Sequence, residues 1–244
     1  MDAFKDATRT NTGLLAAAER RALVWLAERM PAWIHSDHLT GLALVSMLMV
    51  GVSYAVSSRA PIALWSVVLG LALNWFGDSL DGTLARARRQ QRPRYGFYVD
   101  HIFDSFGALF VLGGLALSGR MTPLVAAAVL IAYYLLSIEI YLATYCVGRF
   151  EMSHWGLGPT ELRIALAFGT LTLLVKPAVT IAGRRFLLFD VAGIVAGAGM
   201  TLVAVLAMSR HVRTLYLAEP LMPRRPVEVL HDLTDDVLRV AKEH

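Results

Sequence analysis

Six apolar runs, separated by short polar connectors, dominate the pattern of the sequence. They cover residues 39–58, 61–80, 100–118, 122–147, 160–181 and 186–209. Each run has about the 20 residues that a helix needs to cross the hydrocarbon core of a bilayer. The connectors carry breakers and polar residues, as in "SSRAP" and "SGRMTP". The pattern therefore predicts an all-α integral membrane protein with six transmembrane helices.

The two ends of the chain have other patterns. Near the N-terminus, apolar side chains recur at three- and four-residue steps, with charged residues mostly off the stripe formed by Leu14, Leu15, Ala18, Ala22, Trp25, Leu26 and Met30. This spacing predicts an amphipathic helix in the membrane interface, and it is not the pattern of a cleaved signal peptide. We expect residues 1–36 to form this segment, residues 37–210 a six-helix transmembrane domain, and residues 211–244 a cytoplasmic tail with one short helix.

Composition agrees with the membrane class. Apolar residues make up 56% of the chain and charged residues 17%, and the mean hydropathy is +0.54. This leaves too little polar surface to cover a soluble globule of 244 residues. The single cysteine, Cys146, excludes an internal disulfide and a four-cysteine zinc site.

The basic residues predict the orientation. If both termini lie in the cytoplasm, the arginines between residues 86 and 94 and those near the N-terminus also lie inside. Five basic residues then fall outside, namely Arg59, Arg120, Lys176, Arg184 and Arg185, so the bias follows the positive-inside rule. The net charge of +4, concentrated on the cytoplasmic face, indicates contact with anionic lipid rather than with nucleic acid.

Four aspartates stand in or beside the second and third apolar runs. Asp78 and Asp81 are three residues apart, and Asp100 and Asp104 are four apart, so each pair shares one face of a helix. A cluster of carboxylates at a membrane is costly unless a cation lies among them. Hard oxygen ligands suit Mg²⁺ or Mn²⁺, and two such ions could clamp a phosphoryl group. The alternative is that the aspartates have no ligand and are acidic helix caps beside a solvated loop.

Small residues accompany the acidic pairs. Gly82, Ala85 and Gly96 lie within a few residues of them, and their missing side chains let a substrate approach the backbone. Arg86 adds a guanidinium group, which can donate two parallel hydrogen bonds to a phosphate or a carboxylate.

These eight positions resemble the signature of the CDP-alcohol phosphotransferase family, D-x-x-D-G-x-x-A-R followed by G-x-x-x-D-x-x-x-D. The gap between the two halves is nine residues here, where eight is commoner in the pattern. The motif covers about an eighth of the chain, and the six-helix layout and the amphipathic N-terminal helix also look like the family.

The resemblance implies transfer of a substituted phosphate, here expected to be phosphatidyl, from a CDP-linked donor to the hydroxyl of an alcohol, with release of CMP. It implies that Asp78, Asp81, Asp100 and Asp104 bind two ions of Mg²⁺ or Mn²⁺, with Asp104 also the general base. Gly82, Ala85, Arg86 and Gly96 would contact the CDP moiety. It further implies a role in phospholipid synthesis, membrane lipids around the protein, a cytoplasmic active site and a homodimer.

Several other polar residues remain open candidates. His38 and Thr40 are either part of the start of the first span or near the nucleotide, and His101 is either a polar filler or part of the site. Glu161 and Arg163 either pair with neighbours or face the substrate pocket. Glu139 is an acid inside a span, which favours a functional role, the alternative being a contact with an arginine or with another subunit. The arginines of the loop, Arg88, Arg89, Arg92 and Arg94, are expected to face the lipid surface rather than substrate.

Two other functions compete with the enzyme. A divalent-cation transporter could use the aspartates as a permeation site, although acids would then be expected near mid-bilayer on several helices. A noncatalytic scaffold with a decayed motif is the other, but all eight positions are intact. The sequence leaves open the acceptor alcohol and the choice of donor between CDP-diacylglycerol and a smaller CDP-alcohol.

Overall fold

The computed structural model describes residues 8–10, 16–151, 158–219 and 221 of the chain. It separates into two units, Met1–Met208 and Ser209–His244, and the first contains every residue of the candidate site. The short helix predicted in the tail lies outside the described residues, as do Leu14 and Leu15 of the predicted N-terminal stripe.

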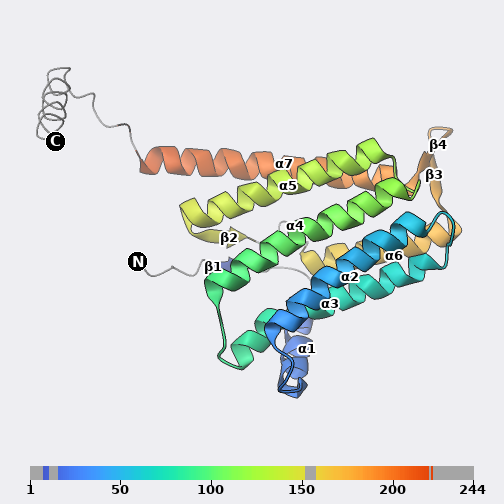
Figure 1. Ribbon diagram of the computed structural model, residues 1–244. Helices are drawn as coiled ribbons and strands as arrows, with labels where there is room; N and C mark the ends of the chain where they lie inside the picture. Colours follow the sequence, from blue (N-terminus) through green and yellow to red (C-terminus); the bar gives the residue numbers. More distant parts are fainter. Residues whose placement is uncertain (1–7, 11–15, 152–157, 220, 222–244) are drawn as a thin grey trace, which may run out of the picture. The chain divides into compact units, whose positions relative to one another are not determined.

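Seven helices form the described part of the chain (Figure 1). They are α1 (Ala16–Arg29), α2 (Ser36–Val56), α3 (Ala63–Ala87), α4 (Pro93–Leu117), α5 (Pro123–Val147), α6 (Pro159–Val175) and α7 (Leu188–Ala218). The described residues also include four short strands. β1 (Thr8–Thr10) pairs in parallel with β2 (Arg149–Glu151), and β3 (Ala178–Ile181) pairs antiparallel with β4 (Arg184–Leu187). The fold is all-α in its main elements, as predicted.

Five of the helices, α2, α3, α4, α5 and α7, are long and apolar enough to cross a membrane. The protein is therefore of the multi-pass membrane class. Proline stands at the first position of both α4 and α5, where its missing N–H has no intrahelical partner to lose.

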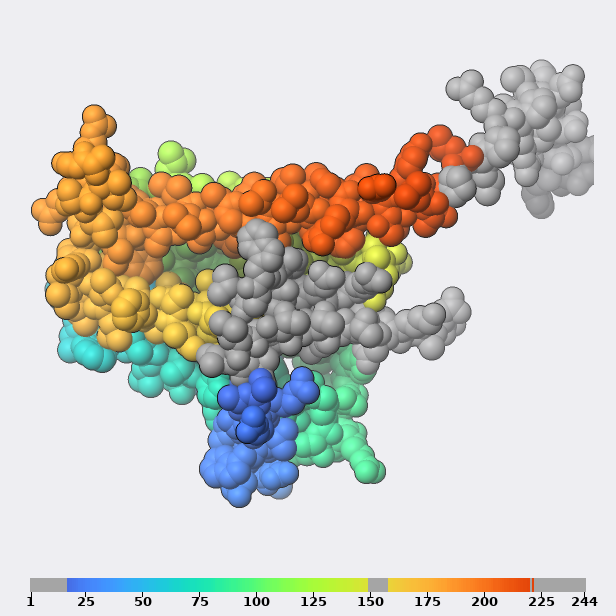
Figure 2. All heavy atoms as spheres, turned by 180° about the vertical axis from the view of Figure 1, so that it is seen from behind, coloured from blue at the N-terminus to red at the C-terminus, as the bar shows by residue number. Residues whose placement is uncertain are grey.

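A sixth transmembrane helix over residues 160–181 is not shown. Helix α6 has 17 residues and ends at Val175, because Pro177 cannot continue a helix and disfavours helical backbone at Lys176 before it. The residues after it form the β3–β4 hairpin, whose two turn residues, Ala182 and Gly183, both have positive φ as a type I′ turn requires. The hairpin and α1 lie at opposite ends of the bundle of α2 to α6 (Figure 2).

The bundle is built around α2. Both α3 and α4 pack along it, α5 packs on α4, and α6 packs on α3. The larger core includes Val50 and Tyr54 of α2, whose side chains are fully buried. The Tyr54 hydroxyl lies 2.5 Å from the Thr170 hydroxyl of α6, so the bundle also has a buried polar tie.

A second, smaller core fixes α1. Leu23 and Ala27 of α1 are buried against Leu80 and Leu84 of α3 and Leu39 of α2. The predicted helix is therefore present, and Leu26 and Met30 of the predicted stripe are half-buried and pack against this core. Trp25 of that stripe is 54% exposed, which leaves this side of α1 available to a membrane interface.

Candidate active site

The four aspartates lie on the two helices that flank α2. Asp78 and Asp81 are on α3, and Asp100 and Asp104 are on α4. Asp81 interacts electrostatically with Asp100 and Asp78, and Asp104 interacts with the other three. The two pairs predicted from the spacing thus face a common region between α3 and α4. Asp81 is buried, Asp78 and Asp100 are half-buried, and Asp104 is accessible.

Thr40 belongs to this region. Its hydroxyl donates a hydrogen bond to the Asp81 carboxylate at 2.7 Å and also lies 3.0 Å from the backbone oxygen of Ser36, so one α2 side chain orients an acid of α3. Of the two candidates at the start of the first span, Thr40 therefore joins the site. His38 instead accepts the His35 backbone N–H through Nδ1 at 3.1 Å and so shapes the first turn of α2.

Arg163 brings a positive charge to the acids. Its guanidinium forms an ion pair with Asp78 and donates to Asn74 Oδ1 at 2.8 Å, while Asn74 Nδ2 donates to the Ala43 oxygen at 3.1 Å. The three contacts connect α6, α3 and α2. The Arg163–Asp78 side chains are only 16% and 28% exposed, so the pair is largely shielded from solvent. Arg163 is thus at the site, whereas Glu161 accepts the Gly158 N–H at 3.0 Å and caps α6.

The carboxylate oxygens of the four aspartates are the type of ligand that divalent cations bind. Four carboxylates share the region, Arg163 interacts with two of them, and carboxylate oxygens are the ligands that Mg²⁺ and Mn²⁺ prefer. As the side chains stand, however, no three His, Cys, Asp or Glu side chains of the described residues are grouped around one metal position. The Asp78 carboxylate pairs with Arg163 and the Asp81 carboxylate is hydrogen-bonded to Thr40, so these two acids point to different partners.

The small residues of the motif surround the same end of α3. A Cβ atom at Gly82 would lie 3.3 Å from the Arg86 guanidinium, and the same guanidinium donates to the Thr83 hydroxyl at 3.0 Å. Gly96 borders open space, since no atom lies within 4 Å of the position of its absent Cβ. The arrangement leaves the backbone accessible at Gly96 and holds Arg86 close to Gly82.

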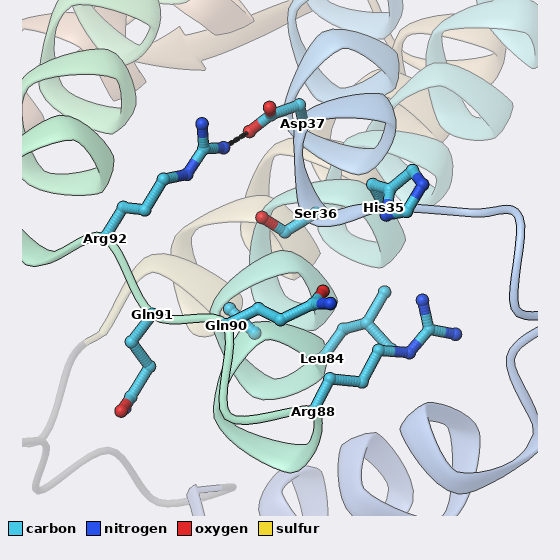
Figure 3. Close-up of a pocket in the computed structure, with 9 residues that line it drawn as sticks. His35, Ser36, Asp37, Leu84, Arg88, Gln90, Gln91 and Arg92 are labelled. Carbon is cyan, nitrogen blue, oxygen red and sulfur yellow. Dashed lines mark hydrogen bonds and ion pairs between the residues drawn. The ribbon is translucent and has the colours of Figure 1, made fainter.

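A pocket of about 400 Å³ opens beside the acidic region (Figure 3). Its lining comes from the start of α2, the end of α3 and the following loop, and it includes Ser36 and Ala85. Ser36 is one helical turn before Thr40, and Ala85 is one turn after Asp81. Because Thr40 and Asp81 are hydrogen-bonded, the pocket lies about one turn, roughly 5 Å, from that bond.

The loop arginines have structural contacts that the sequence did not predict. Arg88 donates to the backbone oxygens of Met30 (3.0 Å), Pro31 (2.9 Å) and Ile34 (2.5 Å), so it holds the connector between α1 and α2. Arg92 pairs with Asp37, and this hydrogen bond raises the pKa of the Arg92 guanidinium. These contacts do not test the expectation that the loop faces the lipid surface rather than substrate.

Glu19 of α1 is a residue that the sequence analysis missed. Its Oε1 atom accepts hydrogen bonds from Trp75 Nε1 (2.8 Å) and Ser79 Oγ (3.2 Å) of α3, and from Thr160 Oγ1 (2.7 Å) of α6. Ser79 directly follows Asp78, and Thr160 is three residues before Arg163. One carboxylate therefore joins the helices that carry this ion pair. No signal in the local sequence distinguishes Glu19 from the other charged residues of α1.

Two further candidates lie on α4 and α5. His101 Nδ1–H donates to the Phe97 backbone oxygen at 2.6 Å, and its ring stacks on the Phe97 ring with 4.1 Å between the centroids, with Tyr141 of α5 against its edge. It is thus a packing residue between α4 and α5 in this structure. Glu139 of α5 is half-buried.

Comparison with known families places the chain. The profile of the CDP-alcohol phosphatidyltransferase family matches residues 33–207, which include the whole bundle from α2 and most of α7. A search of curated proteins found no match. The chain belongs to the CDP-alcohol phosphatidyltransferase family and is a CDP-alcohol phosphotransferase.

Proposed function

We propose that the protein transfers a phosphatidyl group from CDP-diacylglycerol to the hydroxyl of an alcohol and releases CMP. Family membership supplies the reaction class, a substituted phosphate moved from a CDP-linked donor. The observation that carries the proposal is the position of the 400 Å³ pocket one helical turn from the Thr40–Asp81 bond. A nucleotide in that pocket would extend its diphosphate toward the four aspartates.

The surroundings of the site support a lipid donor. The site lies in a bundle whose outer surfaces carry large exposed apolar side chains, such as Ile102 and Phe106 on α4. A donor with two acyl chains can leave these in the bilayer while its nucleotide stays at the polar end of the helices. A smaller CDP-alcohol would use the pocket alone, so the choice of donor is tested below.

The acidic residues have the chemistry that the reaction needs. We propose that Asp78, Asp81, Asp100 and Asp104 hold two divalent cations, Mg²⁺ or Mn²⁺. Such ions, when bound, neutralise the diphosphate and stabilise the charge that develops on the leaving phosphate. Thr40 keeps the Asp81 carboxylate oriented, and Arg163 does the same for Asp78.

Asp104 is the proposed general base. It is accessible, and it interacts with the other three acids. The oxygen of the acceptor alcohol forms a bond to the phosphorus that carries the lipid, the bond from that phosphorus to the CMP oxygen breaks, and the alcohol proton passes to Asp104. A carboxylate in this role typically contributes 10²- to 10⁴-fold to the rate. Gly82, Ala85, Arg86 and Gly96 are proposed to contact the CDP moiety.

CMP release by the full-length protein in lipid nanodiscs tests the proposal. CDP-diacylglycerol or a CDP-alcohol would be supplied with Mg²⁺ or Mn²⁺ and a panel of acceptor alcohols. We expect CMP release only with a divalent cation, and a loss of about 100-fold or more in Asp100→Asn and Asp104→Asn. Asp190→Asn is the matched control, because Asp190 accepts hydrogen bonds from Thr122 at the hairpin end of the bundle, away from the site.

Two outcomes would overturn the proposal. One is metal-driven ion flux into vesicles without CMP release, which would favour a transporter. The other is equal activity of the wild type and both active-site variants. Turnover of small CDP-alcohols but not of CDP-diacylglycerol would change the donor and leave the aspartate roles intact.

A further inference from the structure

A second pocket lies at the hairpin end of the bundle. Its volume is about 260 Å³. All three connections at this end contribute to its lining, namely Ser58 from the α2–α3 turn, Ser118, Gly119 and Arg120 from the α4–α5 turn, and Pro177 and Leu187 from the base of the hairpin (Figure 1). Pockets for drug-sized ligands have about 300–1,000 Å³, so this one has the size for a small polar group.

Arg120 gives the pocket a lasting positive charge, because a guanidinium stays protonated. Its Nη2 donates to the Ser57 backbone oxygen at 3.0 Å, and its Nε donates to the Ser57 hydroxyl at 3.4 Å. The side chain is half-buried and is thus held against the α2–α3 turn. These contacts use two of the five N–H donors of a guanidinium, so an anion can accept from the others.

The charge around the pocket also favours an anion. Four exposed basic side chains belong to the same connections, namely Arg59, Lys176, Arg184 and Arg185. Residues 57–62, 118–122 and 176–190 hold these four, Arg120 and a single acid, Asp190, whose carboxylate accepts hydrogen bonds from Thr122. Such an excess of positive charge raises the local concentration of anions. In the predicted orientation these basic residues lie outside, where the positive-inside rule gives no reason for them.

Apolar side chains border the pocket on the bilayer side. Leu117 and Val175, the last residues of α4 and α6, are 76% and 78% exposed, and each is within two residues of the pocket lining. On the hairpin, Ile181 and Phe186 are exposed beside the basic residues. A ligand that contacts both Arg120 and these side chains needs an anionic group joined to a hydrocarbon chain, which a free phosphate lacks.

We propose that the pocket at the hairpin end binds the headgroup phosphate of an anionic phospholipid. Arg120 donates hydrogen bonds to the phosphate oxygens, and Ser58 adds a hydroxyl donor. The exposed basic residues attract the negative headgroup, and the acyl chains lie along Leu117 and Val175. A lipid in this position contacts all three connections and so stabilises the folded bundle. None of these residues belongs to the acidic region, so the binding is independent of the proposed reaction.

Thermal unfolding of the full-length protein in a nonionic detergent tests the site. Added phosphatidylglycerol should raise the thermal midpoint, and phosphatidylcholine, whose headgroup has no net charge, should raise it less. For Arg120→Gln we expect the phosphatidylglycerol concentration at half-maximal effect to increase about tenfold, because hydrogen bonds to a charged group are lost. Arg89→Gln is the matched control. It removes an exposed arginine from the α3–α4 loop and should respond as the wild type does.

Ser58→Glu covers the case in which Arg120→Gln weakens the fold. Ser58 is exposed and lines the pocket, and the contacts of Arg120 with Ser57 do not involve its side chain. The added carboxylate should repel the lipid phosphate, with an unchanged thermal midpoint in lipid-free detergent.

Three outcomes would overturn the inference. One is an equal response of the wild type and both pocket variants to phosphatidylglycerol, and another is equal stabilisation of the wild type by the two lipids. The third is stabilisation by glycerol phosphate at the same concentrations, which would indicate a site for a free anion instead of a lipid.

Discussion

At the scale of single residues, Arg163 decides the charge balance of the acidic region. Its guanidinium forms an ion pair with Asp78 and donates a hydrogen bond to Asn74 Oδ1. Removing the guanidinium would leave both acceptors without this donor. We expect Arg163→Ala to lower the free energy of unfolding by about 2 kcal/mol, the usual scale for hydrogen bonds that involve a charged group. The measurement is the thermal midpoint in detergent.

Adding Mg²⁺ tests whether the loss of stability in Arg163→Ala comes from the lost positive charge. A divalent cation bound to the acids would replace the lost positive charge, so Mg²⁺ should raise the thermal midpoint of Arg163→Ala by more than that of the wild type. Arg59→Ala removes an exposed arginine at the hairpin end and should show neither effect. An equal response of all three proteins to Mg²⁺ would argue against a cation site at these acids.

The sequence predicted the acids but only some of their partners. Residues three and four apart share a helix face whatever the rest of the fold, so the Asp pairs were visible from spacing alone. Asn74, Arg163 and Glu19 reach the site through contacts between helices that are far apart in the chain. Those contacts depend on how α1 and α6 pack on α3, which local spacing does not determine.

At the scale of elements, two glycines allow α2 and α4 to approach closely. A Cβ atom at Gly114 would lie 2.1 Å from the Gly51 oxygen, and backbone cannot move aside as a flexible side chain can. We expect Gly114→Ala to destabilise the protein by about 3 kcal/mol, at the upper end of ordinary overpacking. Thermal unfolding in detergent would measure it.

The neighbouring Gly113 provides the control for that prediction. No atom lies within 4 Å of the position of its Cβ, so Gly113→Ala should be neutral or stabilise the helix by up to about 1 kcal/mol. Equal behaviour of the two variants would show that α2 and α4 are not in close contact. In α7, a Cβ atom at Gly193 would lie 2.2 Å from the Met121 side chain, while Gly199 borders open space, so Gly193 is at a close helix contact and Gly199 is not.

Glu19 joins three elements through one oxygen. Glu19→Ala would leave donors on Trp75, Ser79 and Thr160 without this acceptor, and we expect a loss of about 2–3 kcal/mol. Glu19→Gln keeps an accepting oxygen and should recover part of the loss. Thermal midpoints measure both, with Glu28→Gln as the exposed control on the same helix. A Glu19→Ala protein as stable as the wild type would contradict the proposed linkage of α1, α3 and α6.

The apolar runs predicted the order of the helices, but the pattern failed at the end of α6. The run over residues 160–181 continues through Ala178, Val179 and Ile181, which are as apolar as the helix before them. Beyond Pro177 these residues pair with β4 instead. Alternation and β-branched residues over so short a stretch do not separate a strand from a helix, and the I′ turn at Ala182–Gly183 has only its glycine as a signal.

At the scale of the whole membrane domain, α1 and the β3–β4 hairpin lie at opposite ends of the bundle (Figure 1). The proposed nucleotide pocket, Arg88 and the α1–α2 connector share the first end. The second end carries Lys176, Arg184 and Arg185, which are exposed around the hairpin. A soluble nucleotide can reach only the end that faces its compartment, so the orientation of the domain determines where the reaction takes place.

Cysteine labelling tests the predicted orientation, in which the α3–α4 loop is cytoplasmic because the arginines from Arg86 to Arg94 and those of α1 outnumber the basic residues of the hairpin end. In a Cys146→Ser background, a membrane-impermeant maleimide should label Thr180→Cys in intact cells, and label Gln91→Cys only in inside-out vesicles. The reverse pattern would place the pocket outside and contradict the orientation. Because neither the pocket nor the acids change in that case, CMP release from detergent-solubilised protein would be unaffected, which separates topology from catalysis.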